Sequence, residues 1–177
     1  MFYISETKSN APEEFQSELQ QEIYGQLKKA GIAFQRVDTD EAITMEDCVA
    51  INAALDMEMV KTLFLCNRQQ TDFYIFVTKG NKPFSSKDFS HALDISRVSF
   101  APAELMQTML GTPIGAATVL SAVIAPANVA FIFDNEIVTM QSYGCSDGTT
   151  TGYMKISIDD VFAYLRSLGK NWQVITL

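Results

Sequence analysis

The chain has 177 residues, of which 47% are hydrophobic and 19% charged, and its net charge is −8. This length supports one well-formed core and is short for two domains, so we expect a single domain over 1–177 with 1–14 as an N-terminal extension. No run approaches the roughly 20 continuous apolar residues of a membrane helix, and the first ten residues show no signal-peptide pattern. These features predict a protein with no membrane partner and no secretory signal.

Cysteine and histidine usage narrows the chemistry further. The three cysteines, Cys48, Cys66 and Cys145, show no CxxC spacing, which favours reduced thiols in a cytoplasmic protein over a disulfide framework. The one histidine, His91, leaves little room for a histidine-based metal site or a Ser-His-Asp triad. We therefore expect neither a metal site nor a histidine-based triad.

Positive charge gathers in one segment of this acidic chain. Residues 61–97 carry six Lys or Arg against three Asp, whereas 1–60 and 98–177 are both net negative. Two interpretations remain open, an ordinary solvated surface or a small patch that faces phosphate groups. Lys61 begins this segment within the apolar run MVKTLFLCN (59–67), although burying an ammonium group is costly unless something compensates it.

The first third of the chain predicts two helices with a strand between them. Apolar residues recur every four positions after Pro12, and Gly31 follows the last of them, which is typical of an amphipathic helix. The run IAFQRV (32–37) predicts a strand. Thr44 is placed as the N-cap of a second helix over 45–55. Its inward-facing residues are predicted to be Val49, Ala50 and Ala53.

The rest of the chain mixes strand and helix patterns. The runs at 60–65 and 73–78 predict a hairpin. In order, we then expect a short helix capped by Ser85 or Ser86 and ending near Leu93, a helix over 101–110 before Gly111, strands over 117–124 and 128–138, a helix over 157–169 and a last strand over 172–177. Because the two kinds of element do not alternate regularly, the pattern favours α+β or irregular α/β over a doubly wound sheet.

Two glycine-containing segments are candidate ligand-binding loops. LGTPIGAATV (110–119) has small side chains that let a ligand approach the backbone N–H groups, although an ordinary tight loop is the commoner explanation. SYGCSDGTTTGY (142–153) offers hydroxyls and a thiol to line a pocket, or a simple turn at Asp147 and Gly148. As a nucleophile, Cys145 has no identifiable partner base.

In their order along the chain, these segments resemble the prolyl-tRNA editing domain family. Its members are free-standing aminoacyl-tRNA deacylases, also called YbaK-like or ProX-like, related to the insertion domain of bacterial prolyl-tRNA synthetase. The resemblance covers about residues 15–177 and implies a mixed α/β (α+β) fold, with a largely antiparallel curved sheet and flanking helices. The matching segments are LKKAGIAFQRVDTDEAITMED, MVKTLFLCNRQQTDFYIFVT, SSKDFSHALDISRVSFAPAELM, LGTPIGAATVLSAV and GTTTGYMKISIDDVFAYLRSLG.

The resemblance implies hydrolysis of the ester that joins a wrong amino acid to the 3′ end of a tRNA. The expected substrate is alanyl-tRNA-Pro, with cysteinyl-tRNA-Pro second, and proline-sized or serine substrates remain open. No cofactor, catalytic metal or protein nucleophile is implied, because a hydroxyl of the terminal adenosine assists the water. Two other hypotheses stay open, a non-catalytic module that binds tRNA ends or a protein, and a thiol-dependent hydrolase that uses Cys145.

The same resemblance assigns roles to residues. Lys61 is expected to meet the phosphate or terminal nucleotide of the tRNA 3′ acceptor end, with its ammonium at the pocket mouth. The backbone N–H groups of Gly115, Ala116 and Ala117 are expected to hold the aminoacyl carbonyl, an effect worth about 3 kcal/mol per donor on a developing oxyanion. The remaining expected substrate-binding residues are Thr62, Gly111, Thr118, Cys145, Ser146, Thr149 and Thr151.

Two departures from the family pattern bear on these expectations. Many members carry a proline at the position of Val119, whereas this chain has Pro113 before its second glycine, which bears on the shape of the loop. Many members also carry a histidine-proline pair in the later loop, where this chain has Gly144, Cys145 and Ser146. The second departure bears on the amino acid that the pocket prefers.

Overall fold

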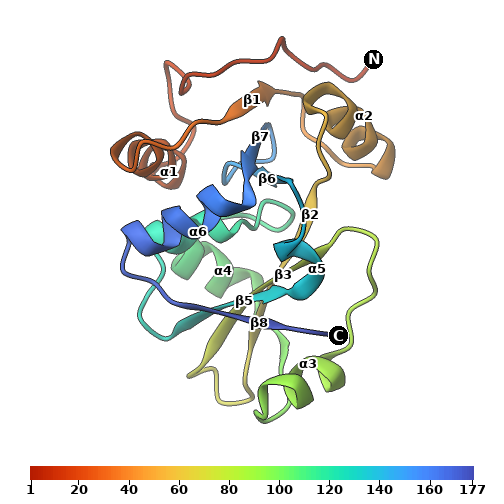
Figure 1. Cartoon of the computed structure of the whole chain (residues 1–177), viewed down its shortest axis with the longest axis vertical. Helices are drawn as coiled ribbons and strands as arrows, with labels where there is room; N and C mark the ends of the chain where they lie inside the picture. The colour runs from red at the N-terminus through yellow and green to blue at the C-terminus, as the bar shows by residue number, and fades with distance from the viewer.

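The computed structural model describes residues 1–177, which form six α-helices, one 3-10 helix and eight strands (Figure 1). None of the helices has the length and apolar character needed to cross a membrane. The helices are α1 (Glu18–Lys29), α2 (Met45–Leu55), α3 (Ser86–Leu93), α4 (Ala103–Leu110), the 3-10 helix η1 (Val119–Val123), α5 (Asn135–Val138) and α6 (Ile158–Ser167). The strands are β1 (Gln35–Asp38), β2 (Val60–Cys66), β3 (Phe73–Lys79), β4 (Ser99–Phe100), β5 (Val129–Asp134), β6 (Ser142–Ser146), β7 (Gly152–Ser157) and β8 (Trp172–Ile175).

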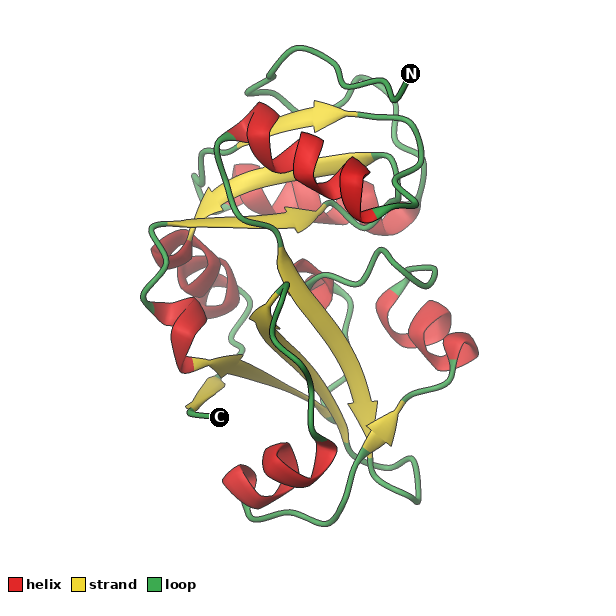
Figure 2. Cartoon of the chain, turned by 90° about the vertical axis from the view of Figure 1, so that its right-hand side faces the viewer, coloured by secondary structure: helices red, strands yellow, loops and turns green.

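The strands form two sheets, seen one above the other in Figure 2. The upper sheet is antiparallel, in the order β1-β7-β6. The lower sheet has the order β4-β2-β3-β5-β8, with antiparallel pairing around β2 and parallel pairing of β5 with β3 and β8. The mixed α/β class predicted from the sequence is confirmed, although the strands divide between two sheets.

The two sheets touch where β2 begins. Met59 forms a parallel β-bridge with Gly144 of β6, and the Gly144 N–H donates to the Glu58 carbonyl at 3.2 Å. A Cβ at position 144 would lie 2.6 Å from the Met57 sulfur, which is closer than real contacts allow. The absence of a side chain at Gly144 therefore permits the close approach of the two sheets.

Alternating residues of the lower sheet supply two hydrophobic clusters. Phe64, Ile75 and Phe131 lie in one cross-strand row and belong to the main core, which α1, η1 and α6 help to build. The next row, Leu63, Phe76 and Ile132, packs on the other face with Phe89 of α3. Burial of each such side chain stabilises the fold by roughly 1.5–3 kcal/mol. Side chains of the upper sheet, Cys145, Met154 and Ile156, join the main core.

The two helices predicted in the first third of the chain are present, but the start of α1 and the inward face of α2 differ from the prediction. The first helix begins at Glu18 rather than near Pro12, because the Ser17 hydroxyl accepts the Gln20 N–H at 3.1 Å and caps it. Thr44 caps α2 as predicted. The predicted inward face of α2 is wrong, because the side chains that pack inward are Ile51 and Leu55, whereas Val49 is 65% exposed.

The strand predictions for the second half of the chain are partly wrong. The predicted strand over 117–124 is the 3-10 helix η1, whose first turn is capped by the Thr118 hydroxyl. The predicted strand over 128–138 ends at Asp134, where α5 begins. The segment 142–146, treated as part of a loop, is strand β6.

The N-terminal segment lies against β1. Ile4 and Lys8 form isolated bridges with Thr39 and Arg36, respectively. The Arg36 side chain is buried, and its Nε donates to the Asn10 carbonyl at 2.6 Å. Residues 4–10 are therefore held on the edge of the upper sheet.

Candidate functional site at the junction of the two sheets

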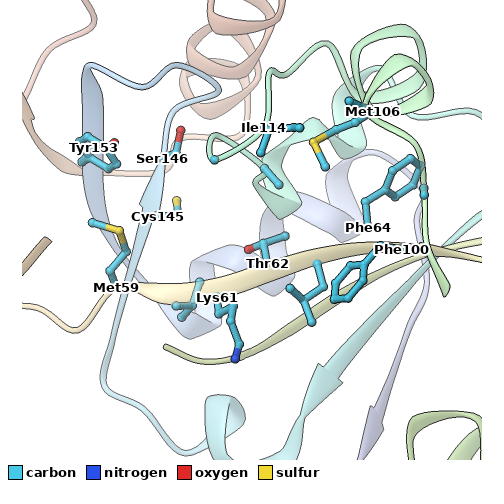
Figure 3. Close-up of a pocket in the computed structure, with 16 residues that line it drawn as sticks. Met59, Lys61, Thr62, Phe64, Phe100, Met106, Ile114, Cys145, Ser146 and Tyr153 are labelled. Atoms are coloured by element: carbon cyan, nitrogen blue, oxygen red, sulfur yellow. The ribbon is translucent and has the colours of Figure 1, made fainter. Parts of the chain in front are cut away.

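A cavity of about 420 Å³ opens where the two sheets meet (Figure 3). Segment 59–64 forms one wall, and residues 100–106 of β4 and α4 form the next. The loop residues Ile114, Gly115 and Ala117 face them, and β6 and β7 close the cavity. Most of the lining is hydrophobic, and the volume falls in the usual range for a small-ligand site.

The loop between α4 and η1 brings Gly115 and Ala117 to the cavity lining. Gly115 has a φ of +91°, a conformation that side-chain-bearing residues rarely adopt. The N–H of Ala116 donates to the Pro113 carbonyl at 3.2 Å, and its side chain is buried away from the cavity. The N–H groups of Gly115 and Ala117 make no hydrogen bond within the chain. Of the three expected donors, these two have no acceptor within the chain.

Lys61 and Thr62 are neighbours on β2, so their side chains point to opposite faces of the strand. In Figure 3 the Thr62 hydroxyl lies on the side of Cys145, whereas the Lys61 ammonium points away beneath the strand. That ammonium donates a hydrogen bond to the Lys82 carbonyl. Lys61 therefore lines the cavity, but its charge is not at the expected pocket mouth.

Cys145 and Ser146 of β6 both line the cavity. Burial raises the pKa of the Cys145 thiol to about 12, so this thiol is protonated at neutral pH. The Ser146 hydroxyl donates to the Thr149 carbonyl at 2.7 Å and accepts the Gly148 N–H at 3.0 Å. Both side chains therefore act here as walls of fixed position, and neither has the environment of a nucleophile.

The buried carboxylate of Asp147 ties this wall to α1. It accepts hydrogen bonds from Gln20 Nε2 at 2.9 Å, Tyr24 Oη at 2.8 Å and Thr149 Oγ1 at 2.7 Å. Burial, reinforced by the Asp147 charge, raises the pKa of Tyr24, which stays a neutral donor. The loop after β6, which contains Asp147 and Thr149, therefore cannot shift relative to α1 without breaking this buried hydrogen-bond network.

Several expected site residues lie outside the cavity. Thr149 is engaged with Asp147, and Thr151 pairs with Gln16 at the surface. Gly111 ends α4 and packs near Leu19, whereas Thr118 is buried as the cap of η1. Ala116 is also absent from the cavity lining, and its N–H is engaged in the turn with Pro113.

Sequence reasoning missed the apolar walls. The cavity is also lined by Met59, Phe64, Phe100, Met106 and Tyr153. In the sequence these residues are indistinguishable from ordinary core positions. The available signal was Ile114, an isolated large apolar residue among small loop residues, which is 73% exposed at the rim.

In the basic segment 61–97, some cationic side chains form ion pairs and others do not. Lys79 lies 3.8 Å from Glu58, and Lys82 lies 2.8 Å from the buried carboxylate of Asp134. Arg68 and Arg97 form no ion pair and line a surface groove of about 550 Å³ together with Gln69, Ser96 and Ser99. Ser99 of this groove precedes Phe100 of the main cavity on β4, and the two sites have no lining residue in common.

Comparisons with known proteins agree with this architecture. The family model of the aminoacyl-tRNA editing domain matches residues 39–164, a span that contains the whole cavity lining. Among solved structures, the hypothetical protein APE2540 is 16% identical, with a TM-score of 0.68 over 87% of this chain and 98% of that one. A protein described as a "putative trans-editing enzyme for prolyl tRNA synthetase" is 14% identical, with a TM-score of 0.66 over 91% and 98%. A scaffold protein used for epitope backbone grafting is 15% identical, with a TM-score of 0.69 over 91% and 97%. These structures share the fold of this chain.

Proposed function

We propose that this chain, which belongs to the aminoacyl-tRNA editing domain family, hydrolyses mischarged aminoacyl-tRNA in trans. The proposed substrate is alanyl-tRNA-Pro, with cysteinyl-tRNA-Pro as the second candidate. The family membership supports editing of mischarged tRNA in general. The choice of a small amino acid follows from the family resemblance, and the mostly apolar lining with the Cys145–Ser146 wall supports a side chain without charge.

One observation carries the proposal. The N–H groups of Gly115 and Ala117 lack acceptors within the chain and border a cavity whose opposite wall holds Thr62. Such paired donors suit the carbonyl oxygen of an ester, on which negative charge develops during hydrolysis. Each donor commonly contributes about 3 kcal/mol to the stabilisation of that charge.

The proposed reaction needs no covalent enzyme intermediate. Water adds to the ester carbonyl carbon, the bond from that carbon to the ribose oxygen breaks, and the ribose oxygen takes a proton. A hydroxyl of the terminal adenosine assists the water. The raised pKa of Cys145 supports this route, because a protonated thiol is a poor nucleophile.

The proposed partner is the 3′ acceptor end of tRNA, with tRNA-Pro first. Because the Lys61 ammonium points away from the cavity (Figure 3), a phosphate bound by it would lie beneath β2, beyond the pocket mouth. An ammonium group has three N–H donors, so Lys61 keeps donors for such a phosphate beside its bond to the Lys82 carbonyl. Arg68 and Arg97, which form no ion pair, supply two further cations in a surface groove of an otherwise acidic chain. The three free cysteines are consistent with work in a reducing cytoplasm.

A deacylation panel tests the proposal. The purified protein is incubated with tRNA-Pro carrying alanine, cysteine, serine or the correct proline, and released amino acid is measured against spontaneous hydrolysis. We expect alanine to be released well above background while prolyl-tRNA-Pro is spared. Release from none of the mischarged species contradicts the proposal. Binding of tRNA without any release selects the non-catalytic binding module instead.

A further inference from the structure

Tyr143 of β6 carries a buried hydroxyl that no other group of the chain pairs with. Its side chain is fully buried, and its Oη has no hydrogen-bond partner. An unpaired buried hydroxyl costs about 1–3 kcal/mol, a cost that phenylalanine at the same position would avoid. A group of this kind calls for an explanation other than packing.

The other buried tyrosines have partners for their hydroxyls. Tyr24 donates to Asp147 at 2.8 Å, and Tyr164 donates to the Leu120 carbonyl at 2.7 Å. Tyr153 donates to the Thr150 carbonyl at 3.2 Å. Tyr143 is therefore the exception in a chain that otherwise satisfies its buried phenols.

The unpaired hydroxyl lies directly behind the cavity wall. Tyr143 and Cys145 are two residues apart on β6, so their side chains share one face of the strand, and Cys145 lines the cavity. Burial raises the pKa of the Tyr143 phenol, and the neighbouring Thr62 hydroxyl opposes that rise. Thr62 itself lines the cavity.

We propose that Tyr143 is a positioning residue that acts on the substrate through Thr62. When the aminoacyl-adenosine end occupies the cavity, the Tyr143 O–H donates to Thr62 Oγ1, and the Thr62 O–H is thereby directed at an oxygen acceptor of the substrate. A hydroxyl can donate and accept at once, and each bond in such a chain strengthens the next. Neither hydroxyl loses its proton. This inference deepens the proposed function and rests on it for the identity of the ligand.

Binding of a non-hydrolysable ligand tests the inference without requiring turnover. The probe is alanyl-adenosine with an amide in place of the ester, and its Kd is measured for the wild type, Tyr143→Phe, Thr62→Val and the double variant. Loss of one well-placed hydrogen bond predicts about tenfold weaker binding by Tyr143→Phe. Because Tyr143 acts through Thr62, the double variant should bind no more weakly than Thr62→Val alone.

A matched control separates this role from a structural one. Tyr164→Phe also removes one hydroxyl from a fully buried tyrosine, but that hydroxyl already has the Leu120 carbonyl as its partner. We expect Tyr164→Phe to unfold at a lower temperature and to bind the probe as the wild type does. Tyr143→Phe should unfold at the wild-type temperature or higher, and with tRNA it should raise KM while kcat stays within about twofold.

Three results overturn the inference. The first is wild-type affinity for the probe in Tyr143→Phe, and the second is that Tyr143→Phe weakens binding as much in the Thr62→Val background as in the wild type. The third is that Tyr143→Phe lowers the unfolding temperature as Tyr164→Phe does. Probe binding by the wild type without deacylation of any tRNA contradicts the proposed function alone. Deacylation that Tyr143→Phe leaves unchanged in both KM and kcat contradicts the role of Tyr143 alone. Failure of the wild type to bind the probe contradicts both.

Discussion

Gly144 of β6 lies directly against Met59 at the start of β2, in the parallel bridge that joins the two sheets. The contact brings segment 59–64 and the Cys145–Ser146 wall together around one cavity. Because Met57 and the Glu58 carbonyl already occupy the space beside Gly144, the cavity depends on the absence of a side chain there.

We predict that Gly144→Ala separates the two sheets at this point. The new methyl group must displace the Met57 sulfur or the Glu58 carbonyl, and overpacking of this kind costs about 1–3 kcal/mol of unfolding free energy. Urea denaturation measures that loss, and deacylation should fall with it. Gly25→Ala is the matched control, because a Cβ there meets nothing and a helix interior gains about 1 kcal/mol from alanine. Equal stability of the two variants would contradict the account.

Lys61 provides a second prediction. If its ammonium binds a phosphate of the acceptor end, Lys61→Ala should lower kcat/KM by roughly tenfold to a hundredfold, the usual worth of a hydrogen bond to a charged group. Lys29→Ala removes the same charge from the exposed end of α1 and should leave kcat/KM within about twofold. Steady-state kinetics with alanyl-tRNA-Pro distinguish them, and an identical effect of both variants removes Lys61 from the site.

Arg68 and Arg97 should contribute to tRNA affinity through phosphate contacts. The salt dependence of tRNA binding is the slope of log K against the logarithm of the salt concentration. Arg97→Gln should reduce the size of this slope by about 0.7–0.9, as expected for one lost phosphate contact. Arg166→Gln removes an equal charge from the face where it packs on Trp172, and its slope should match the wild type. If both variants change the slope equally, the groove beside β4 has no special role.

Cys145 should not act as a nucleophile. Burial raises its pKa to about 12, and a thiol is protonated below its pKa, so almost no thiolate is present between pH 6 and 9. We predict that kcat shows no rise attributable to a thiolate over this range. Cys145→Ala enlarges the cavity and should lower kcat by less than about tenfold. A fall of more than about a thousandfold with intact folding would revive the thiol-dependent mechanism.

Local signals in the sequence predicted much of the fold. Thr44 was predicted as a helix cap and Ser85 as one of two candidates with Ser86, because a hydroxyl there can accept a backbone N–H within its own turn. The hairpin of β2 and β3 followed from two β-rich runs. The segment 117–124 was predicted wrongly as a strand, because η1 is buried on nearly all sides and shows no helical periodicity.

The site was harder to predict than the fold. Family resemblance directed attention to Lys61 and to the loop at Gly115, and both line the cavity. It did not reveal that Ala116 forms a turn with Pro113, since a backbone hydrogen bond of this kind depends on the loop conformation. Nor could it show that Thr149 would be engaged by Asp147, because that network needs Gln20 and Tyr24 from the far end of the chain.

The central claim is that the cavity between the two sheets is where the ester is hydrolysed. Ala117 lines that cavity, so Ala117→Leu places a larger apolar side chain in space that the substrate would occupy. The most direct test is the single-turnover rate of alanine release from alanyl-tRNA-Pro by the wild type and by this variant, with circular dichroism to establish that both are folded. The account predicts fast release by the wild type and release near the spontaneous rate by the variant. Release at the wild-type rate from a protein whose cavity is filled would contradict it.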